Sequence, residues 1–326
     1  QLCRVIVLDP ACGCGNFLYV SLEHLKRLEG EVLDVAAQFG ESFKLELATH
    51  TVDPHQFLGL EINPRAAAIT ELVLWIGYLQ WHFRTRGQTM PTEPVLKKFK
   101  NIECRDAVLA YDGEPEPARD ATGKAITDWD QRSTKKDPVT GRDVPDESRR
   151  VPLMTYKNPR PAQWPAADYI VGNPPYLGAR TIRPALGDGY LTALRTSHPD
   201  MADNVDYVMY WWHKAASLVR ARKARRFGFI TTNSFSYSFN RSVVEPHLKG
   251  TPPLRLSFAI PDHPWVDSAD GADVRVAMTV ATLGGPTGVL NVLTEESDGG
   301  PDGACVKFKA LTGEIEPNLT IGEDTG

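Results

Sequence analysis

Residues 5–18, VIVLDPACGCGNFL, join a short apolar run to a glycine-rich turn and the start of a helix. The run Val5–Leu8 is β-branched and wholly apolar, which is typical of a strand buried in a parallel sheet. After the turn, apolar residues recur at helical spacing over Phe17–Leu28. A strand, a tight turn and a helix in this order predict the first unit of an α/β fold.

The same alternation continues along the chain. A second apolar run, Phe57–Ile62, leads into a predicted helix over Ala66–Leu79, and Pro64 suits the first helical position, where a missing N–H costs nothing. Further elements are predicted as strands at 102–104, 169–171 and 227–231, a helix over 242–249, and strands at 254–260 and 274–283. The last two strands have no helix between them, so we expect an antiparallel hairpin. The whole pattern predicts a doubly wound, mostly parallel sheet.

One stretch interrupts this pattern. Residues 111–167 hold eight of the 25 prolines, many charges and little periodicity, so we expect a partly mobile, charged insertion before the fourth strand. The tail from Ser297 has turn composition. We therefore divide the chain into a first half of the sheet domain (1–110), the insertion (111–167), a second half (168–296) and a C-terminal extension (297–326).

Composition narrows the class of protein. The 326 residues are 42% hydrophobic, as in soluble globular proteins, and no apolar run approaches the roughly 20 residues of a membrane helix. Five scattered cysteines favour a reducing cytoplasm over a disulfide framework. The start at Gln1 has neither an initiator Met nor a signal pattern, so we expect a fragment of a longer protein. The net charge of −5 argues against nonspecific coating of DNA but permits a local basic face.

Two cysteines in the turn raise the question of a metal. Cys12 and Cys14 have no second Cys/His pair at ligand spacing, so we expect no metal site and interpret them as small residues in a tight turn.

The turn itself is a candidate ligand site. A Gly-x-Gly turn between a buried strand and a helix lets backbone N–H groups approach a ligand closely. A dinucleotide site would need a third glycine, where this chain has Leu18. Glu61, at the end of the second strand, is placed to accept hydrogen bonds from a ribose diol. Asp106, after the third strand, is interpreted either as an acceptor for an adenine amino group or as a turn residue.

The most informative motif is Asn173-Pro174-Pro175-Tyr176, directly after the fourth strand. The amide oxygen of Asn173 and the carbonyl oxygen of Pro174 are suited to accept the two N–H bonds of an exocyclic amine. That arrangement would leave the nitrogen lone pair free to attack a methyl group. The two prolines hold the carbonyl rigidly. The ring of Tyr176 offers a face for stacking a base turned out of a duplex, with its hydroxyl incidental.

Five segments together resemble the gamma-type amino-methyltransferases that act on adenine in DNA. In order they are DPACGCGNF (9–17), GLEIN (59–63), CRDA (104–107), IVGNPPY (170–176) and FGFITTNSF (227–235). Within that family the chain is similar, over about residues 4–283, to the modification domains of fused Type IIG/IIL-like restriction–modification enzymes and to phage-defence methylases. The resemblance implies a Rossmann-like, seven-stranded fold, with the cofactor bound by 1–110 and the target base by 168–296.

The resemblance also implies residue roles. The cofactor would be S-adenosyl-L-methionine and the partner double-stranded DNA with a flipped adenine, methylated at N6. A nuclease or recognition domain outside this chain is a further expected partner, and no membrane is. The predicted cofactor-binding residues are Asp9, Ala11, Cys12, Gly13, Gly15, Phe17, Glu61 and Asp106, and the predicted catalytic residues are Asn173, Pro174, Pro175 and Tyr176. Cys14 departs from the family, which usually has Ser there, and the family's helix before the first strand is missing.

Two alternatives use the same motifs. A methyltransferase of a protein glutamine amide or of ribosomal RNA would present a similar planar amide or amine. A catalytically silent DNA-binding subunit would keep the fold, although the intact motifs argue against it. The aromatic segment Asn204–Trp212 favours DNA if it is exposed, but it is more typical of a core-packing helix.

Overall fold

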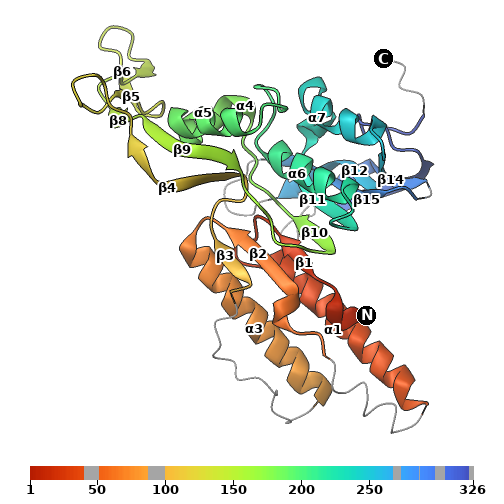
Figure 1. Cartoon of the computed structure of the whole chain (residues 1–326). Coiled ribbons are helices and arrows are strands. Elements are labelled where there is room, and N and C mark those ends of the chain that lie inside the picture. The colour runs from red at the N-terminus through yellow and green to blue at the C-terminus, as the bar shows by residue number, and fades with distance from the viewer. Residues whose placement is uncertain (40–50, 87–99, 267–272, 286, 298–304, 323–326) are drawn as a thin grey trace.

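Five parallel strands form the part of the sheet that carries the predicted motifs. In a computed structural model of the chain, their order is β3 (Ile102–Cys104), β2 (Phe57–Glu61), β1 (Val7–Asp9), β10 (Tyr169–Gly172) and β11 (Arg226–Thr232) (Figure 1). The structure describes every residue except 40–50, 87–99, 267–272, 286, 298–304 and 323–326. From β1 the chain winds to β2 and β3 on one side, then to β10 and β11 on the other. Open α/β sheets bind ligands at such a switch point, here between β1 and β10.

Beyond β11 the sheet becomes mixed. β13 (Asp273–Leu283) runs antiparallel to β11 and to β12 (Leu254–Val266), so the predicted antiparallel pairing is confirmed. β14 (Gly288–Ser297) runs parallel to β12, and β15 (Cys305–Gly313) antiparallel to β14. The prediction of seven, mostly parallel strands is therefore wrong, because the described residues form a mixed sheet of nine. In β14 only Gly288 and Leu290 are buried, so this strand lacks the continuous apolar run that marks the central ones.

Helices cover both faces of the parallel strands. Side chains alternate across a strand, and the two neighbours Val7 and Leu8 accordingly belong to different hydrophobic clusters. Val7 packs with Leu22 of one helix and Leu74 of another, whereas Leu8 belongs to the cluster that contains Trp212. The doubly wound arrangement is thus present. The α-helices of the described residues are α1 (Asn16–Ala37), α3 (Pro64–Arg86), α4 (Ala179–Leu186), α5 (Asp188–Ser197), α6 (Val208–Arg220) and α7 (Ser238–Lys249). Short 3-10 helices span η1 (Leu2–Arg4), η2 (Pro54–Gln56) and η3 (Asn233–Ser236).

Local chemistry sets the start of α3. The side chain of Asn63 accepts hydrogen bonds from the N–H groups of Arg65 and Ala66, at 2.9 and 3.3 Å, and so caps the helix. Pro64 is the first helical residue, as predicted. The aromatic segment Asn204–Trp212 enters α6, where Trp211 and Trp212 are buried in the core. Its core-packing interpretation is therefore the correct one.

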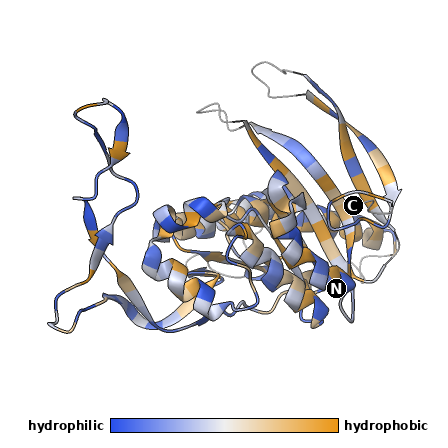
Figure 2. Cartoon of the chain, turned by 90° about the horizontal axis from the view of Figure 1, so that it is seen from above, coloured by the Kyte–Doolittle hydropathy of each residue, from blue (hydrophilic) through white to orange (hydrophobic). Residues whose placement is uncertain are grey.

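The stretch predicted as an irregular insertion folds into an arm of three antiparallel ladders. It projects away from the sheet and helices (Figure 2). From base to tip the paired strands are β4 (Leu109–Pro117) with β9 (Met154–Pro161), β5 (Thr127–Trp129) with β8 (Arg150–Pro152), and β6 (Thr134–Lys136) with β7 (Asp143–Pro145). Aspartates close its turns, as where Asp137 accepts the N–H groups of Val139 and Thr140. Local bonds of this kind order a stretch that has little core and little apolar periodicity.

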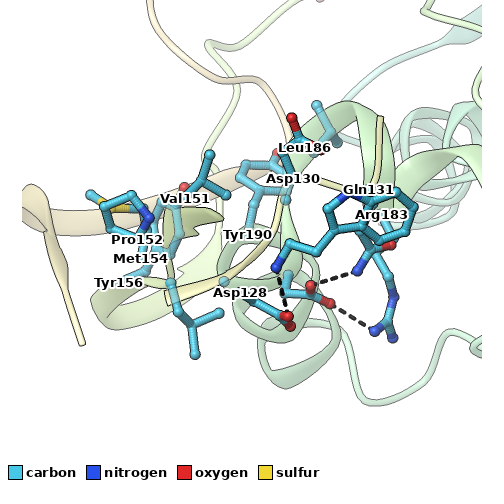
Figure 3. A pocket seen from close by; sticks show the side chains of 15 residues that line it. Asp128, Asp130, Gln131, Val151, Pro152, Met154, Tyr156, Arg183, Leu186 and Tyr190 are labelled. Atoms are coloured by element: carbon cyan, nitrogen blue, oxygen red, sulfur yellow. Dashed lines mark hydrogen bonds and ion pairs between the residues drawn. The ribbon is translucent and has the colours of Figure 1, made fainter. Parts of the chain in front are cut away.

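The arm is docked to α5 and to the end of α4. A Cβ atom on Gly189 of α5 would lie 1.8 Å from the backbone oxygen of Met154, so only glycine permits this approach of helix to β9. Gln131 donates to Asp188 at 2.9 Å, and Arg183 pairs with the same carboxylate at 2.7 Å (Figure 3). These side chains line a cavity of about 70 Å³ beneath the arm. These contacts anchor the middle of the arm, next to the β5–β8 ladder, to α4 and α5.

Candidate active site

A cavity of about 490 Å³ lies where β1, β2, β3 and β10 end. Each of these strands is followed by residues that line it, which is the edge of the sheet where α/β folds bind ligands. The predicted site residues in its lining are Ala11, Glu61, Asp106, Asn173 and Pro175. The cavity thus brings residues of both predicted halves, 1–110 and 168–296, to one place.

The glycine-rich turn is tied to β2. Gly13 and Gly15 have φ angles of +53° and +86°, which favour glycine, and Gly15 is the N-cap of α1. The N–H of Gly13 donates to a carboxylate oxygen of Glu61 at 2.9 Å, and the other Glu61 oxygen accepts from the N–H of Asn63 at 2.8 Å. Thr70 of α3 donates to the carbonyl of Gly13 at 2.7 Å. Glu61 therefore lines the cavity and also holds the turn in place.

Asp9 lies beneath the cavity and does not line it. Its side chain is buried, and one carboxylate oxygen accepts the N–H of Ala11 at 3.0 Å. The pKa of Asp9 is raised to about 7, mainly by burial; the bond from Ala11 opposes this rise, and the negative charge of Glu61 adds to it. A Cβ atom on Gly172 would lie 2.6 Å from the carboxylate oxygen, so the glycine before the Asn-Pro-Pro-Tyr motif makes room for Asp9.

The Asn173–Tyr176 loop leaves β10 at the rim of the cavity. Pro174 is buried, whereas Pro175 is exposed and lines the cavity. The hydroxyl of Tyr176 donates a hydrogen bond to the amide oxygen of Asn173. Burial raises the pKa of Tyr176 to about 12, so the phenol keeps its proton at neutral pH. The hydroxyl is thus engaged with the amide of Asn173, the residue predicted to be catalytic.

Asp106 closes a turn, and its carboxylate also lies in the wall of the cavity. One carboxylate oxygen accepts the N–H groups of Val108 and Leu109, at 2.7 and 3.1 Å, which closes the turn after β3. The other oxygen accepts from the hydroxyl of Tyr190 at 2.6 Å, inside the lining of the cavity.

The remaining predicted residues lie outside the lining. Cys12 is buried and its thiol lies 3.9 Å from the hydroxyl of Thr70, while burial raises its pKa to about 12. Cys14 is exposed, and Phe17 is half-buried in α1. Cys12, Gly13, Gly15, Phe17, Pro174 and Tyr176 surround the site without lining the cavity.

Sequence reasoning missed nine residues of the lining. They are Pro10, Leu60, Ile62, Ala107, Leu177, Leu186, Tyr190, Tyr207 and Trp211. Ile62 directly follows Glu61 and is exposed, an unusual state for isoleucine next to a buried strand. Trp211 donates through its indole N–H to the carbonyl of Pro10 at 2.9 Å, which ties α6 to the glycine-rich turn.

The family model described as "MmeI, DNA-methyltransferase domain" matches residues 1–287. The chain belongs to this family. The resemblance of the five motifs to modification domains of restriction–modification enzymes is thereby confirmed. No described helix is both long and apolar enough to cross a membrane. Among the residues that the structure describes, no three His, Cys, Asp or Glu side chains gather as metal ligands would.

Two relatives place this MmeI-type domain among longer proteins. DNA methyltransferase A of Bacillus subtilis (strain 168) is 24% identical over 98% of the chain and 30% of its own length. The structure of the Type IIL restriction–modification enzyme MmeI in complex with DNA superposes with a TM-score of 0.65 and 22% identity, over 99% of this chain and 36% of that one. The fold is therefore shared, and the chain spans about a third of the length of each relative.

Proposed function

We propose that this domain transfers a methyl group from S-adenosyl-L-methionine to the N6 amine of adenine in DNA, as the modification activity of a restriction–modification or phage-defence enzyme. Membership of the MmeI methyltransferase family supports the class of reaction. The observation that carries the proposal is the single cavity lined by Glu61, Asp106 and Asn173, because it would bring a donor cofactor and a target amine together.

The cavity suits the proposed cofactor in size and in chemistry. Its volume of about 490 Å³ falls within the range usual for small-molecule sites. Carboxylate oxygens of Glu61 and Asp106 offer acceptors for ribose hydroxyls and for a ring amine, and Ile62 and Trp211 offer apolar surface. Asp9 and the Ala11–Gly15 turn, with Cys12, Gly13 and Phe17 beside it, would hold the methionine part. When bound, the cofactor supplies an electrophilic methyl group on a sulfonium.

The residues after β10 would act on the target. The amide oxygen of Asn173 and the carbonyl oxygen of Pro174 accept the two N–H bonds of the amine, which directs its lone pair toward the methyl group. Pro174 and Pro175 fix the loop, and Tyr176 stacks against the extruded base. The amine loses its proton only after it has been alkylated, so these residues need not include a strong base.

The other assignments concern the rest of the molecule. We propose that residues 1–110 bind the cofactor, 168–296 bind the target base, 111–167 are an insertion and 297–326 an extension. Because the relatives are about three times longer, site recognition and any nuclease are assigned to segments or subunits outside this chain.

A direct assay tests the proposal. The chain is incubated with radiolabelled S-adenosyl-L-methionine and, in parallel, with genomic DNA that lacks adenine methylation, ribosomal RNA and a glutamine-containing protein substrate. We expect label in the DNA, and N6-methyladenine after nuclease digestion and mass spectrometry. Label in RNA or protein alone, or at cytosine alone, would refute the assignment. If the isolated chain is inactive, the same assay is run on the full-length protein, where inactivity on DNA would refute it.

A further inference from the structure

Three side chains from distant parts of the chain form a continuous hydrogen-bonded row in the cavity wall. Asp106 follows β3, Tyr190 lies on α5, and Tyr207 immediately precedes α6. The hydroxyl of Tyr190 lies 2.6 Å from a carboxylate oxygen of Asp106 and 2.6 Å from the hydroxyl of Tyr207. All three residues line the cavity. Neither Tyr190 nor Tyr207 belongs to the family motifs identified from the sequence.

The positions of the protons in this row follow from counting donors. An ionised carboxylate can only accept, so Tyr190 gives its single proton to Asp106. The proton between the two phenols must then come from Tyr207. Burial raises the pKa of both phenols, so each keeps its proton at neutral pH. Both hydroxyl protons are thus used within the row, and what remains for a ligand is a set of acceptor lone pairs.

Such a wall distinguishes two kinds of heterocycle. A ring amine brings N–H donors that these lone pairs can accept. A ring carbonyl is an acceptor, and it would face oxygens of the row that have no proton left to donate. The carbonyl would then be buried without a hydrogen bond, which costs binding free energy. A site built to bond one polar group rejects analogues that lack it more strongly than an apolar pocket does.

We propose that Tyr190 and Tyr207, together with Asp106, determine specificity for a methyl-donor cofactor whose purine carries an amine rather than a carbonyl. This inference rests on the proposed function, which places the nucleobase of the cofactor beside Asp106. Tyr190 is the central residue of the row, since its hydroxyl oxygen accepts the hydrogen bond that Tyr207 donates. Without that oxygen, Tyr207 is free to turn its proton toward a ring carbonyl.

Calorimetric titration with two ligands tests the proposal. S-Adenosyl-L-homocysteine carries the ring amine, and S-inosyl-L-homocysteine carries a carbonyl at the same position. The wild-type chain is expected to prefer the adenosyl ligand by at least about tenfold. In Tyr190→Phe the preference should fall below about threefold, with weaker adenosyl binding and equal or tighter inosyl binding. Tyr210→Phe is the matched control, since it deletes a buried phenol that does not line the cavity. It should keep the wild-type preference.

The opposite response of the two ligands separates specificity from structure. A Tyr190→Phe chain that keeps the wild-type preference, or that loses affinity for both ligands equally, overturns the inference. A melting curve checks folding, and Tyr207→Phe carries the same test if Tyr190→Phe does not fold. A wild-type chain that binds both ligands equally also overturns the inference and leaves the cofactor assignment standing. A wild-type chain that binds neither overturns the cofactor assignment itself.

Discussion

The hydroxyl of Tyr176 donates its proton to the amide oxygen of Asn173, the atom that we assign to the target amine. Both residues belong to one rigid loop after β10. In this orientation of the Asn173 amide, the phenol proton has an acceptor. An amide oxygen has two lone pairs, so it can hold Tyr176 and still accept from a base.

This bond changes the expected effect of removing the hydroxyl. We predict that Tyr176→Phe lowers methyl transfer about fivefold, since one neutral hydrogen bond is worth about 1 kcal/mol. Tyr176→Ala should lower it at least about thirtyfold, because stacking on a base adds about 1–3 kcal/mol. Initial rates with DNA and saturating cofactor measure both. A Phe variant as inactive as the Ala variant, with cofactor still bound, would show that the hydroxyl and not the ring is essential.

Asn173 itself separates chemistry from cofactor binding. We predict that Asn173→Ala abolishes detectable methyl transfer, a loss of about 3 kcal/mol or more in transition-state stabilisation. Cofactor affinity should change less than about twofold, because the proposed cofactor contacts lie on β1, β2 and β3 and the residues that follow them. Single-turnover rates and calorimetric titration of the same preparation measure the two effects. Loss of cofactor binding in a folded variant would move Asn173 from the target to the cofactor.

The buried carboxyl of Asp9 predicts a pH dependence of stability. Its pKa rises from the ordinary 3.8 to about 7 on folding, so the folded chain holds this proton more tightly than the unfolded chain. The stabilisation is therefore complete below pH 3.8 and is lost as pH rises through 7, by at most about 4 kcal/mol. In Asp9→Asn an uncharged amide can still accept from Ala11. We predict that this variant gains stability relative to wild type between pH 4 and pH 7.

Urea unfolding at several pH values checks this prediction. The difference in unfolding free energy between Asp9→Asn and wild type should grow with pH and level off above 7. A difference that is constant across this range would mean that Asp9 is ionised in the folded chain throughout.

The central strands could be predicted because burial on both faces leaves a local signature. β1, β2, β3, β10 and β11 are short apolar runs followed by turns, and each appears where expected. β15 and the arm could not be predicted in this way. Their strands bury few side chains, and the arm is ordered by aspartate-closed turns and ladder bonds, which leave no apolar periodicity.

The site likewise contains residues that could be predicted from the sequence and residues that could not. Glu61, Asp106 and Asn173 follow parallel strands, and the topology alone brings such positions to one edge. Tyr190 and Tyr207 reach that edge from a helix and a loop much later in the chain, so no sequence spacing connects them with Asp106. The hydrogen bond from Gly13 to Glu61 could not be predicted from the sequence either, because it depends on the side-chain rotamer and not on the order of motifs.

The hydrogen bond between Gly13 and Glu61 affects what we expect of a Glu61 variant. We predict that Glu61→Ala weakens cofactor binding at least about tenfold, since a charged acceptor contributes about 1.5–3 kcal/mol per bond and also holds the glycine-rich turn. Glu31→Ala, which removes an equal charge from an exposed position on α1, is the control and should bind normally. Calorimetric titration gives both affinities, and a folded Glu61→Ala chain with wild-type affinity would contradict the assignment.

The outermost hairpin of the arm should be dispensable for folding. Residues 134–145 form the β6–β7 ladder, and the pair that joins them, Lys136 with Asp143, is exposed and so adds little stability. The two ends of this segment already meet, since the N–H of Asp146 donates to the carbonyl of Ser133 at 2.9 Å. Replacing residues 134–145 by Asn-Gly, which favours a tight hairpin turn, should therefore shift the melting temperature by less than about 2 °C.

A contact between the middle of the arm and α4 provides the comparison for this prediction. Arg132 donates to the carbonyl oxygens of Pro184 and Ala185 at the end of α4. Arg132→Ala leaves those carbonyls without this donor and should lower the melting temperature more than removal of the whole tip does. Differential scanning calorimetry of the two variants beside wild type measures the order. If the tip deletion lowers the melting temperature more than Arg132→Ala, the tip is part of the cooperative core and the contact of Arg132 with α4 is not what orders the arm.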